Sequence, residues 1–165
     1  MPYIGPEEYE AIKPCFDANW ITEGPQSKLF NEELIELMGA KYGVFAPNGT
    51  LALYLGLRAM GIGVGDEVIV PDFTFIGSAN AVEMCGATPV FVDVNKEDLQ
   101  ISVKDCGRVL NKNTRAIMPV HLFGLAANMG EIMEFATHHD LKVIEDAAQA
   151  VGVKWRGQHC GTFGD

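Results

Sequence analysis

The sequence predicts an α/β fold in three layers, in which a mainly parallel sheet lies between two layers of helices. Short apolar runs rich in β-branched residues alternate with stretches whose apolar residues recur at helical spacing. Such alternation is typical of βαβ units, which have right-handed crossovers and parallel strands. With 165 residues, of which 48% are hydrophobic, the chain is long enough to bury a core.

Composition and charge narrow the classes of partner. The 22 acidic and 12 basic residues give a formal net charge of −10, and no Lys/Arg cluster suggests a nucleic-acid surface. No apolar run reaches the roughly 18 residues of a membrane span and no leader opens the chain, so we expect a soluble cytoplasmic protein. The four cysteines are far apart without a Cys-x-x-Cys pair, so we expect free thiols and no metal site.

Residues 1–24 predict an N-terminal arm. They carry several prolines and glycines with scattered aromatic residues, and one short helix is expected near residues 7–16. Such an arm needs a surface to pack on, which another subunit could supply. Gly24-Pro25 then interrupts the chain, and residues 27–38 predict a helix that ends at Gly39. Residues 25–165 show no internal linker and are expected to form one domain.

The rest of the chain predicts five strands and the helices that connect them. A helix over residues 51–60 is apolar nearly all round, which indicates burial on every side. Ser102 and Asn128 each have the form of a helix N-cap, and residues 151–155 and 159–163 are expected to pair as a hairpin. The parallel strands are expected near residues 42–46, 67–70, 88–92, 115–120 and 141–145.

The strand at 141–145 ends in a polar group of side chains. It delivers two carboxylates, Glu145 and Asp146, and the carboxamide of Gln149 follows. Ligands bind at the carboxyl ends of strands in open parallel sheets, and an acid placed there can hold a protonated heterocyclic nitrogen. The alternative is a polar strand end at which Asp146 caps a turn.

Asn48-Gly49-Thr50 is a second candidate site. A glycine turn that opens a helix exposes free backbone N–H groups at the positive end of the helix dipole, and the hydroxyl of Thr50 adds another donor. This arrangement binds phosphate; the alternative is a simple Asn/Thr helix cap. The sequence has no Gly-x-Gly-x-x-Gly and no Walker-type lysine motif, which weakens dinucleotide and nucleoside-triphosphate interpretations.

Two other strand ends carry ring side chains. Phe73 and Phe75 follow the strand at 67–70, where an aromatic ring either fills the core or stacks on a flat ligand. For His121, after the strand at 115–120, we favour a hydrogen-bonded polar group over a ligand contact. A phosphate site, an aromatic surface and a carboxylate together fit a phosphorylated, planar, nitrogen-containing ring. Pyridoxal 5′-phosphate (PLP) is the obvious candidate.

Several short motifs follow one another in a distinctive order. They are Trp20-Ile21, Gly24-Pro25, Asn48-Gly49-Thr50-Leu51-Ala52-Leu53, Gly65-Asp66-Glu67-Val68-Ile69-Val70-Pro71, Phe73-Thr74-Phe75, Gly86-Ala87-Thr88-Pro89-Val90-Phe91-Val92-Asp93, Pro119-Val120-His121-Leu122-Phe123-Gly124, Glu145-Asp146-Ala147-Ala148-Gln149-Ala150 and Gly161-Thr162-Phe163-Gly164-Asp165. In this order the chain resembles the N-terminal part of the DegT/DnrJ/EryC1/StrS family of sugar aminotransferases. Residues 99–102 and 114–120 look nearest to perosamine-synthase-like members, which aminate a nucleotide-linked 4-keto sugar.

The resemblance implies a fold, a reaction and a set of cofactor contacts. The fold is the large domain of the fold-type-I, aspartate-aminotransferase-like architecture, normally a homodimer, with residues 25–165 forming an incomplete PLP-binding large domain. The reaction passes an amine from a donor, expected to be glutamate, to a nucleotide-linked keto sugar. The implied contacts are Asn48, Gly49 and Thr50 for the cofactor phosphate, Phe75 for the ring face, Asp146 for the pyridine nitrogen and Gln149 for the ring edge near the phenolic oxygen.

One part of the family pattern lies beyond these residues. The Schiff-base lysine of the family follows the Gly-Thr-Phe-Gly-Asp segment and is expected beyond Asp165, whereas Lys142 and Lys154 do not match its position. We therefore expect a fragment, or one piece of a split aminotransferase, that contains no catalytic residue and is inactive alone. Two alternatives stay open: a non-catalytic interaction module, and a sugar dehydratase with histidine at the lysine position.

Overall fold

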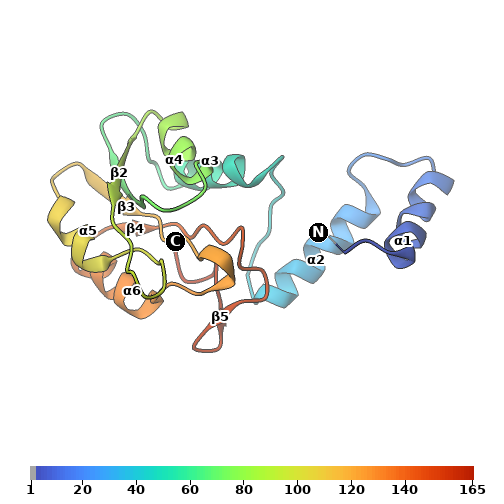
Figure 1. Cartoon of the computed structure of the whole chain (residues 1–165). Coiled ribbons are helices and arrows are strands. Elements are labelled where there is room, and N and C mark those ends of the chain that lie inside the picture. Colours follow the sequence, from blue (N-terminus) through green and yellow to red (C-terminus); the bar gives the residue numbers. More distant parts are fainter. Residues whose placement is uncertain (1–2) are drawn as a thin grey trace.

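A computed structural model describes residues 3–165, in which two helices form an arm that projects from a three-layer α/β body (Figure 1). The first two residues of the predicted arm, 1–2, lie outside the described residues. Among the residues described, no helix combines the length and apolarity needed to cross a bilayer. The α/β class expected from the alternating pattern is confirmed.

Four parallel strands form the central sheet, and they stand in the order β2-β1-β3-β4. The second strand in space, β1, pairs in parallel with both neighbours, so the connections on either side are crossovers. A separate two-stranded antiparallel hairpin follows the sheet. The strands are β1 (Glu67–Pro71), β2 (Thr88–Val92), β3 (Thr114–Ile117), β4 (Lys142–Val143), β5 (Lys154–Trp155) and β6 (Gln158–His159).

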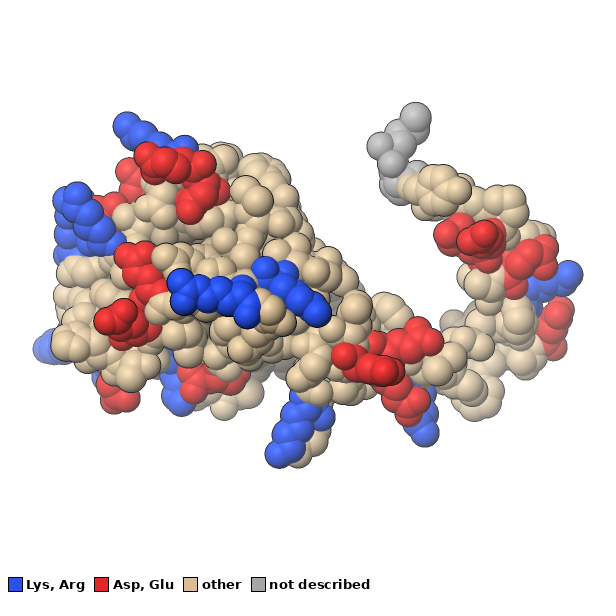
Figure 2. Space-filling view, turned by 90° about the horizontal axis from the view of Figure 1, so that it is seen from below, with Lys and Arg blue, Asp and Glu red and all other residues tan. Residues whose placement is uncertain are grey.

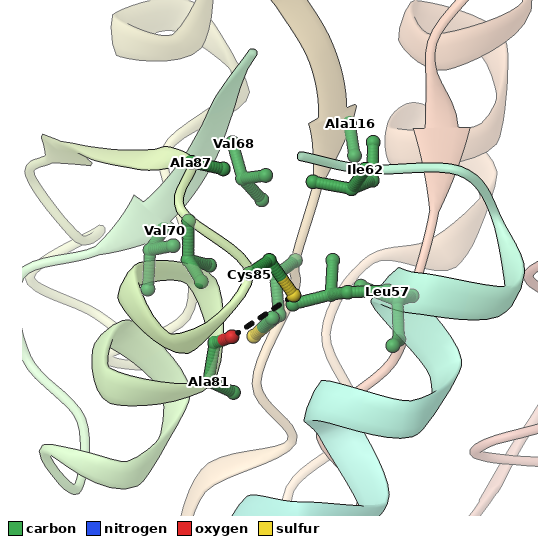
Figure 3. Packing of buried hydrophobic residues seen from close by; sticks show 11 residues of the cluster. Leu57, Ile62, Val68, Val70, Ala81, Cys85, Ala87 and Ala116 are labelled. Atoms are coloured by element: carbon green, nitrogen blue, oxygen red, sulfur yellow. Dashed lines mark hydrogen bonds between the residues drawn. The ribbon is translucent and has the colours of Figure 1, made fainter. Parts of the chain in front are cut away.

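Helices cover both faces of the sheet because alternate strand residues point to opposite faces. Val68 and Val70 of β1 belong with Leu57 to one buried cluster beneath two helices, and Figure 3 shows these side chains around Cys85. Ile69 faces the other way, into a second cluster with Ile132. The helices are α3 (Gly49–Ala59) and α4 (Gly77–Met84) on the first face, and α5 (Val103–Val109) and α6 (Met129–His138) on the second.

Helix ends follow the caps read from the sequence. The Ser102 hydroxyl accepts a hydrogen bond from the Asp105 N–H at 3.3 Å, and the Asn128 side chain accepts from the Glu131 N–H at 3.4 Å. Gly39 closes the 27–38 helix in the left-handed conformation, with φ of 66°. These three predictions are confirmed.

The arm consists of α1 (Pro6–Asp17) and α2 (Pro25–Met38), and it stands away from the body (Figure 1). Neither helix has a buried residue. Figure 2 shows the same separation from below, with acidic side chains spread along the arm and charges of both signs interspersed over the body. The helix predicted near residues 7–16 is therefore present as α1.

The predicted strand at 42–46 is wrong. This segment is extended, but it pairs with no strand among the described residues, and its Val44 side chain is 88% exposed. Alternating aromatic and β-branched residues favour extended backbone, yet a strand also needs a neighbour to complete its ladder. Within the described part of the chain, one side-chain hydrogen bond reaches the segment, from Asn31 Nδ2 to the Gly43 carbonyl at 3.1 Å.

Three smaller predictions also need correction. Helix α3 is buried on one face only: Leu57 is its one fully buried residue and Leu55 is 48% exposed. The strands predicted at 115–120 and 141–145 are shorter, because beyond β3 and β4 the pairing continues only as an isolated parallel bridge between Val120 and Asp146. The hairpin is also shorter than predicted, and Gln158, expected in its turn, belongs to β6.

Candidate functional site

A pocket of about 420 Å³ lies where α3 and α4 begin and where the chain leaves β4. Three segments far apart in the sequence therefore meet at the carboxyl edge of the sheet, as the topology of parallel strands predicts. All six predicted cofactor-site residues line this pocket: Asn48, Gly49, Thr50, Phe75, Asp146 and Gln149.

The α3 side of the pocket is an exposed helix N-terminus. Asn48 is extended and caps the helix, because its Oδ1 accepts a hydrogen bond from the Leu51 N–H at 3.0 Å. Within residues 3–165, the N–H groups of Gly49 and Thr50 have no recorded acceptor. They therefore remain available to an anion, which the helix dipole also favours. The cap and phosphate interpretations are compatible, because they use different donors of one turn.

Strand parity decides which of the two neighbouring carboxylates faces the pocket. Ile144 belongs to the core cluster beneath α3 and α4, whereas Val143 belongs to the cluster on the opposite face. Side chains alternate along an extended chain, so Asp146 follows Ile144 toward the pocket and Glu145 follows Val143 away from it. Asp146 is 8% exposed, and it lines the pocket where Glu145 does not.

The Asp146 carboxylate is held at both oxygens. Its Oδ2 accepts a hydrogen bond from the buried Ser78 hydroxyl at 2.7 Å, and its Oδ1 accepts from the Ala148 N–H at 3.2 Å. The second contact is the turn cap that the sequence offered as an alternative. Each carboxylate oxygen has a further lone pair, so Asp146 caps its turn and can still accept a hydrogen bond from a ligand.

The two aromatic candidates have different surroundings. The Phe75 ring is 69% exposed and lines the pocket, so its face is free to stack on a flat ligand. Phe73 instead packs edge-to-face on Phe123, with ring centroids 6.3 Å apart, and does not line the pocket. Gln149 also lines the pocket, and its Oε1 accepts a hydrogen bond from the Phe123 N–H at 2.9 Å.

Glu145 and His121 form a buried, hydrogen-bonded pair away from the pocket. His121 Nδ1 accepts from the Ala127 N–H at 3.0 Å, so the neutral ring carries its proton on Nε2, 2.9 Å from Glu145 Oε2. Glu145 also accepts from the backbone N–H groups of Gly161, Phe163 and Gly164, at 2.7, 2.6 and 2.9 Å. His121 is thus the hydrogen-bonded polar group that we favoured from the sequence.

The electrostatics of Glu145 follow from this arrangement. Burial by itself raises the pKa of Glu145, but the hydrogen bonds from His121 and the three amides outweigh it and hold the pKa below the usual range. The carboxylate is therefore ionised at neutral pH, with its side chain only 2% exposed. Its charge fixes the Gly161–Gly164 turn to the end of β4.

Sequence reasoning missed Ser78 and Thr74. Ser78 is fully buried and bonds to Asp146, and its oxygen lies 3.1 Å from Thr74 Oγ1. Helical spacing gave no signal for this pair, because Thr74 precedes the N-cap of α4 and only Ser78 lies within that helix. Ser78 and Asp146 are 68 positions apart, so no local sequence pattern indicates their contact.

A family model described as the DegT/DnrJ/EryC1/StrS aminotransferase family matches residues 2–165. The chain belongs to this family. Two curated relatives carry different activities in their names. The chain is 44% identical over 166 residues to a GDP-perosamine synthase of Escherichia coli O157:H7, covering 100% of this chain and 46% of the relative. It is 49% identical over 149 residues to a UDP-N-acetyl-3-dehydro-alpha-D-glucosamine 3-aminotransferase of Acidithiobacillus ferrooxidans, covering 90% of this chain and 40% of the relative.

Solved structures agree with the family in fold. An aminotransferase from Psychrobacter cryohalolentis has a TM-score of 0.95 and 39% identity, covering 99% of this chain and 42% of that one. A Bacillus subtilis protein with the bound cofactor PMP has a TM-score of 0.88 and 32% identity, covering 95% of this chain and 37% of that one. The chain spans less than half the length of these relatives and structures.

Proposed function

We propose that this chain forms the cofactor-binding part of a PLP-dependent aminotransferase that acts on a nucleotide-linked keto sugar. The observation that carries the proposal is the single pocket in which a helix N-terminus, an exposed aromatic face and a held carboxylate converge. Membership of an aminotransferase family supports the reaction class. The names of two relatives, both sugar-nucleotide enzymes, support the substrate class without choosing the sugar.

Each pocket residue has a role in this proposal. Gly49 and Thr50 bind the cofactor phosphate through N–H groups that Asn48 leaves free. Phe75 packs against the ring face. The negative charge of Asp146 keeps the pyridine nitrogen protonated, because an opposite charge nearby favours the charged form. When bound, the cofactor supplies an electron sink for deprotonation at the substrate carbon.

Two further roles belong to the proposal: the residue beside the edge of the cofactor ring, and the lysine that binds the cofactor covalently. Gln149 lines the pocket, and in this proposal it lies near the phenolic oxygen of the ring. No lysine of residues 3–165 lines the pocket. We therefore place the Schiff-base lysine beyond Asp165, in a longer protein or a second piece, and expect the 165 residues to bind PLP without a covalent bond.

The partners follow from the same proposal. The amino donor is glutamate, the acceptor is a nucleotide-linked keto sugar, and the protein works in the cytoplasm without nucleic acid or membrane. It acts as a homodimer. The exposed apolar side chains of α1 and α2 support the last point, since a second copy of the chain would cover them.

Titration of the 165-residue chain with PLP, followed by absorbance and by borohydride reduction, tests the function. We expect saturable binding of one PLP per chain, without a reducible adduct at a unique lysine. Asp146→Asn weakens this binding roughly tenfold or more, because it removes an interaction between opposite charges. The matched control is Asp140→Asn, an exposed site outside the pocket whose φ of 54° asparagine also tolerates.

Two results contradict the proposal. One is equal affinity for PLP in Asp146→Asn and the unaltered chain, which would leave Asp146 as a turn cap alone. The other is a stoichiometric adduct mapped to Lys142 or Lys154, which would move the site away from this pocket.

A further inference from the structure

The carboxylate of Asp146 ends a row of hydrogen bonds that runs through two hydroxyl groups, those of Thr74 and Ser78. An ionised carboxylate only accepts hydrogen bonds, so the Ser78 hydroxyl donates its single proton to Asp146 Oδ2, 2.7 Å away. The Ser78 oxygen is then left as an acceptor toward Thr74 Oγ1 at 3.1 Å, and the Thr74 hydroxyl is the donor. The direction of all these bonds is therefore set by the charge on Asp146.

Residues 74–78, which carry these two hydroxyl groups, border the pocket and lie against Thr50 and Asp146. Thr74, Phe75 and Gly77 line it, and Ser78 lies fully buried directly behind them. Gly77 packs closely against Thr50 of the anion-binding turn, because a Cβ added to Gly77 would lie 2.6 Å from Thr50 Oγ1. Residues 74–78, which lead into α4 and begin it, thus link the aromatic face, the anion-binding turn and the carboxylate.

We propose that Ser78, supported by Thr74, is a positioning residue that aims the Asp146 carboxylate at the ring nitrogen of the cofactor. The inference rests on the proposed function and adds to it a residue that does not touch the cofactor. Contacts on both oxygens, Ser78 at one and Ala148 at the other, fix the carboxylate plane. With Ser78 absent, one contact remains and the carboxylate can turn about it, which weakens a directional charge-assisted hydrogen bond.

A second serine–aspartate pair in the same chain provides a control. The Ser102 hydroxyl donates to Asp105 Oδ2 at 2.6 Å, but this pair caps α5 and lies outside the pocket. Ser102→Ala therefore removes the same kind of contact and lowers stability, as loss of an N-cap does, without touching Asp146.

The experiment binds PLP labelled with ¹⁵N in its ring to the chain and records the ¹⁵N chemical shift across the neutral pH range. The unaltered chain is expected to keep the ring nitrogen protonated throughout. In Ser78→Ala the ring loses its proton at lower pH, and the affinity for PLP falls about fivefold to tenfold. Ser102→Ala matches the unaltered chain in both readouts. Ser78→Cys, which keeps the shape with a weaker donor, and Thr74→Val shift the titration in the same direction by less.

The outcomes separate the two proposals. If the unaltered chain binds no PLP, the proposed function fails and the positioning role fails with it. If PLP binds but Ser78→Ala keeps the same ¹⁵N titration and affinity, only the positioning role is overturned. Should Ser78→Ala not fold, unchanged titrations in both Ser78→Cys and Thr74→Val overturn it instead.

Discussion

The arm and the body of this molecule form helices equally well but bury them very differently. Helices α1 and α2 are 12 and 14 residues long and have no buried residue, whereas each of α3 to α6 buries at least one side chain. The arm is not short of apolar residues: Tyr9, Phe16 and Trp20 are each more than half exposed. Local sequence thus indicates where a helix can form, while burial depends on a partner surface, and the body has one in its sheet.

A pair of identical substitutions tests this comparison with the largest expected effect. Ile117 in β3 is fully buried, and Ile12 in α1 is 51% exposed. Ile117→Ala should lower the free energy of unfolding by about 2–5 kcal/mol, because it removes buried methyl groups and leaves a cavity. Ile12→Ala should change it by about 0.5 kcal/mol or less, since alanine also favours the helix. Urea denaturation measures both, and equal losses would refute the comparison.

The buried pair of Glu145 and His121 gives the next largest expected effect on stability. Glu145→Gln replaces a carboxylate oxygen, which accepts from backbone amides, with an NH₂ group that cannot accept. The free energy of unfolding should fall by about 2–3 kcal/mol. Glu8→Gln in the exposed arm, where the carboxylate accepts from the Gly5 N–H, serves as the matched control and should leave stability unchanged. A stable Glu145→Gln variant would mean that the Gly161–Gly164 turn is held by other contacts.

The same carboxylate predicts how stability depends on pH. The pKa of Glu145 in the folded chain is lowered from its ordinary value of 4.5. The group therefore stabilises the fold fully above that value, and the contribution is lost as the pH falls through the lowered pKa. Melting temperatures measured between about pH 6 and pH 3 should fall more steeply for the unaltered chain than for Glu145→Gln. Parallel curves would show that protonation of Glu145 does not contribute to acid unfolding.

A substitution in the arm should have the smallest effect on the stability of the fold, but it should weaken dimerisation. If a second copy covers the arm, Phe16→Glu should weaken dimerisation about tenfold or more, because it places a charge in an apolar contact. The unfolding free energy of the body should not change, since Phe16 is 66% exposed. Sedimentation velocity over a range of concentrations measures this. A chain that stays monomeric at high concentration, with or without the substitution, would contradict the homodimer.

Much of the body could be read from the sequence because its signals are local. The caps at Ser102 and Asn128 in the body, like the stop at Gly39 in the arm, depend on residues within one helical turn. The pocket was also predictable, because carboxyl ends of parallel strands meet at one edge whatever their distance in sequence. The opposite directions of the Glu145 and Asp146 side chains also follow from the alternation of side chains along a strand.

What the sequence left out depends on contacts between distant residues. The extended segment at 42–46 has the composition of a strand, and only the absence of a neighbour among residues 3–165 separates it from one. The apolar circumference of α3 suggested burial all round, but the body covers one face. The bond between Ser78 and Asp146 joins residues 68 positions apart, so no local pattern announces it.

The central claim is that PLP binds where α3 and α4 begin. The most direct test is a two-dimensional ¹H–¹⁵N NMR spectrum of the chain, recorded as PLP is added. We expect saturable shifts in the backbone amides of Gly49, Thr50 and Gly77, which line the pocket. Shifts confined to another pocket, such as the one of about 290 Å³ beside Pro14 and Trp20 in the arm, would contradict binding of PLP at this site.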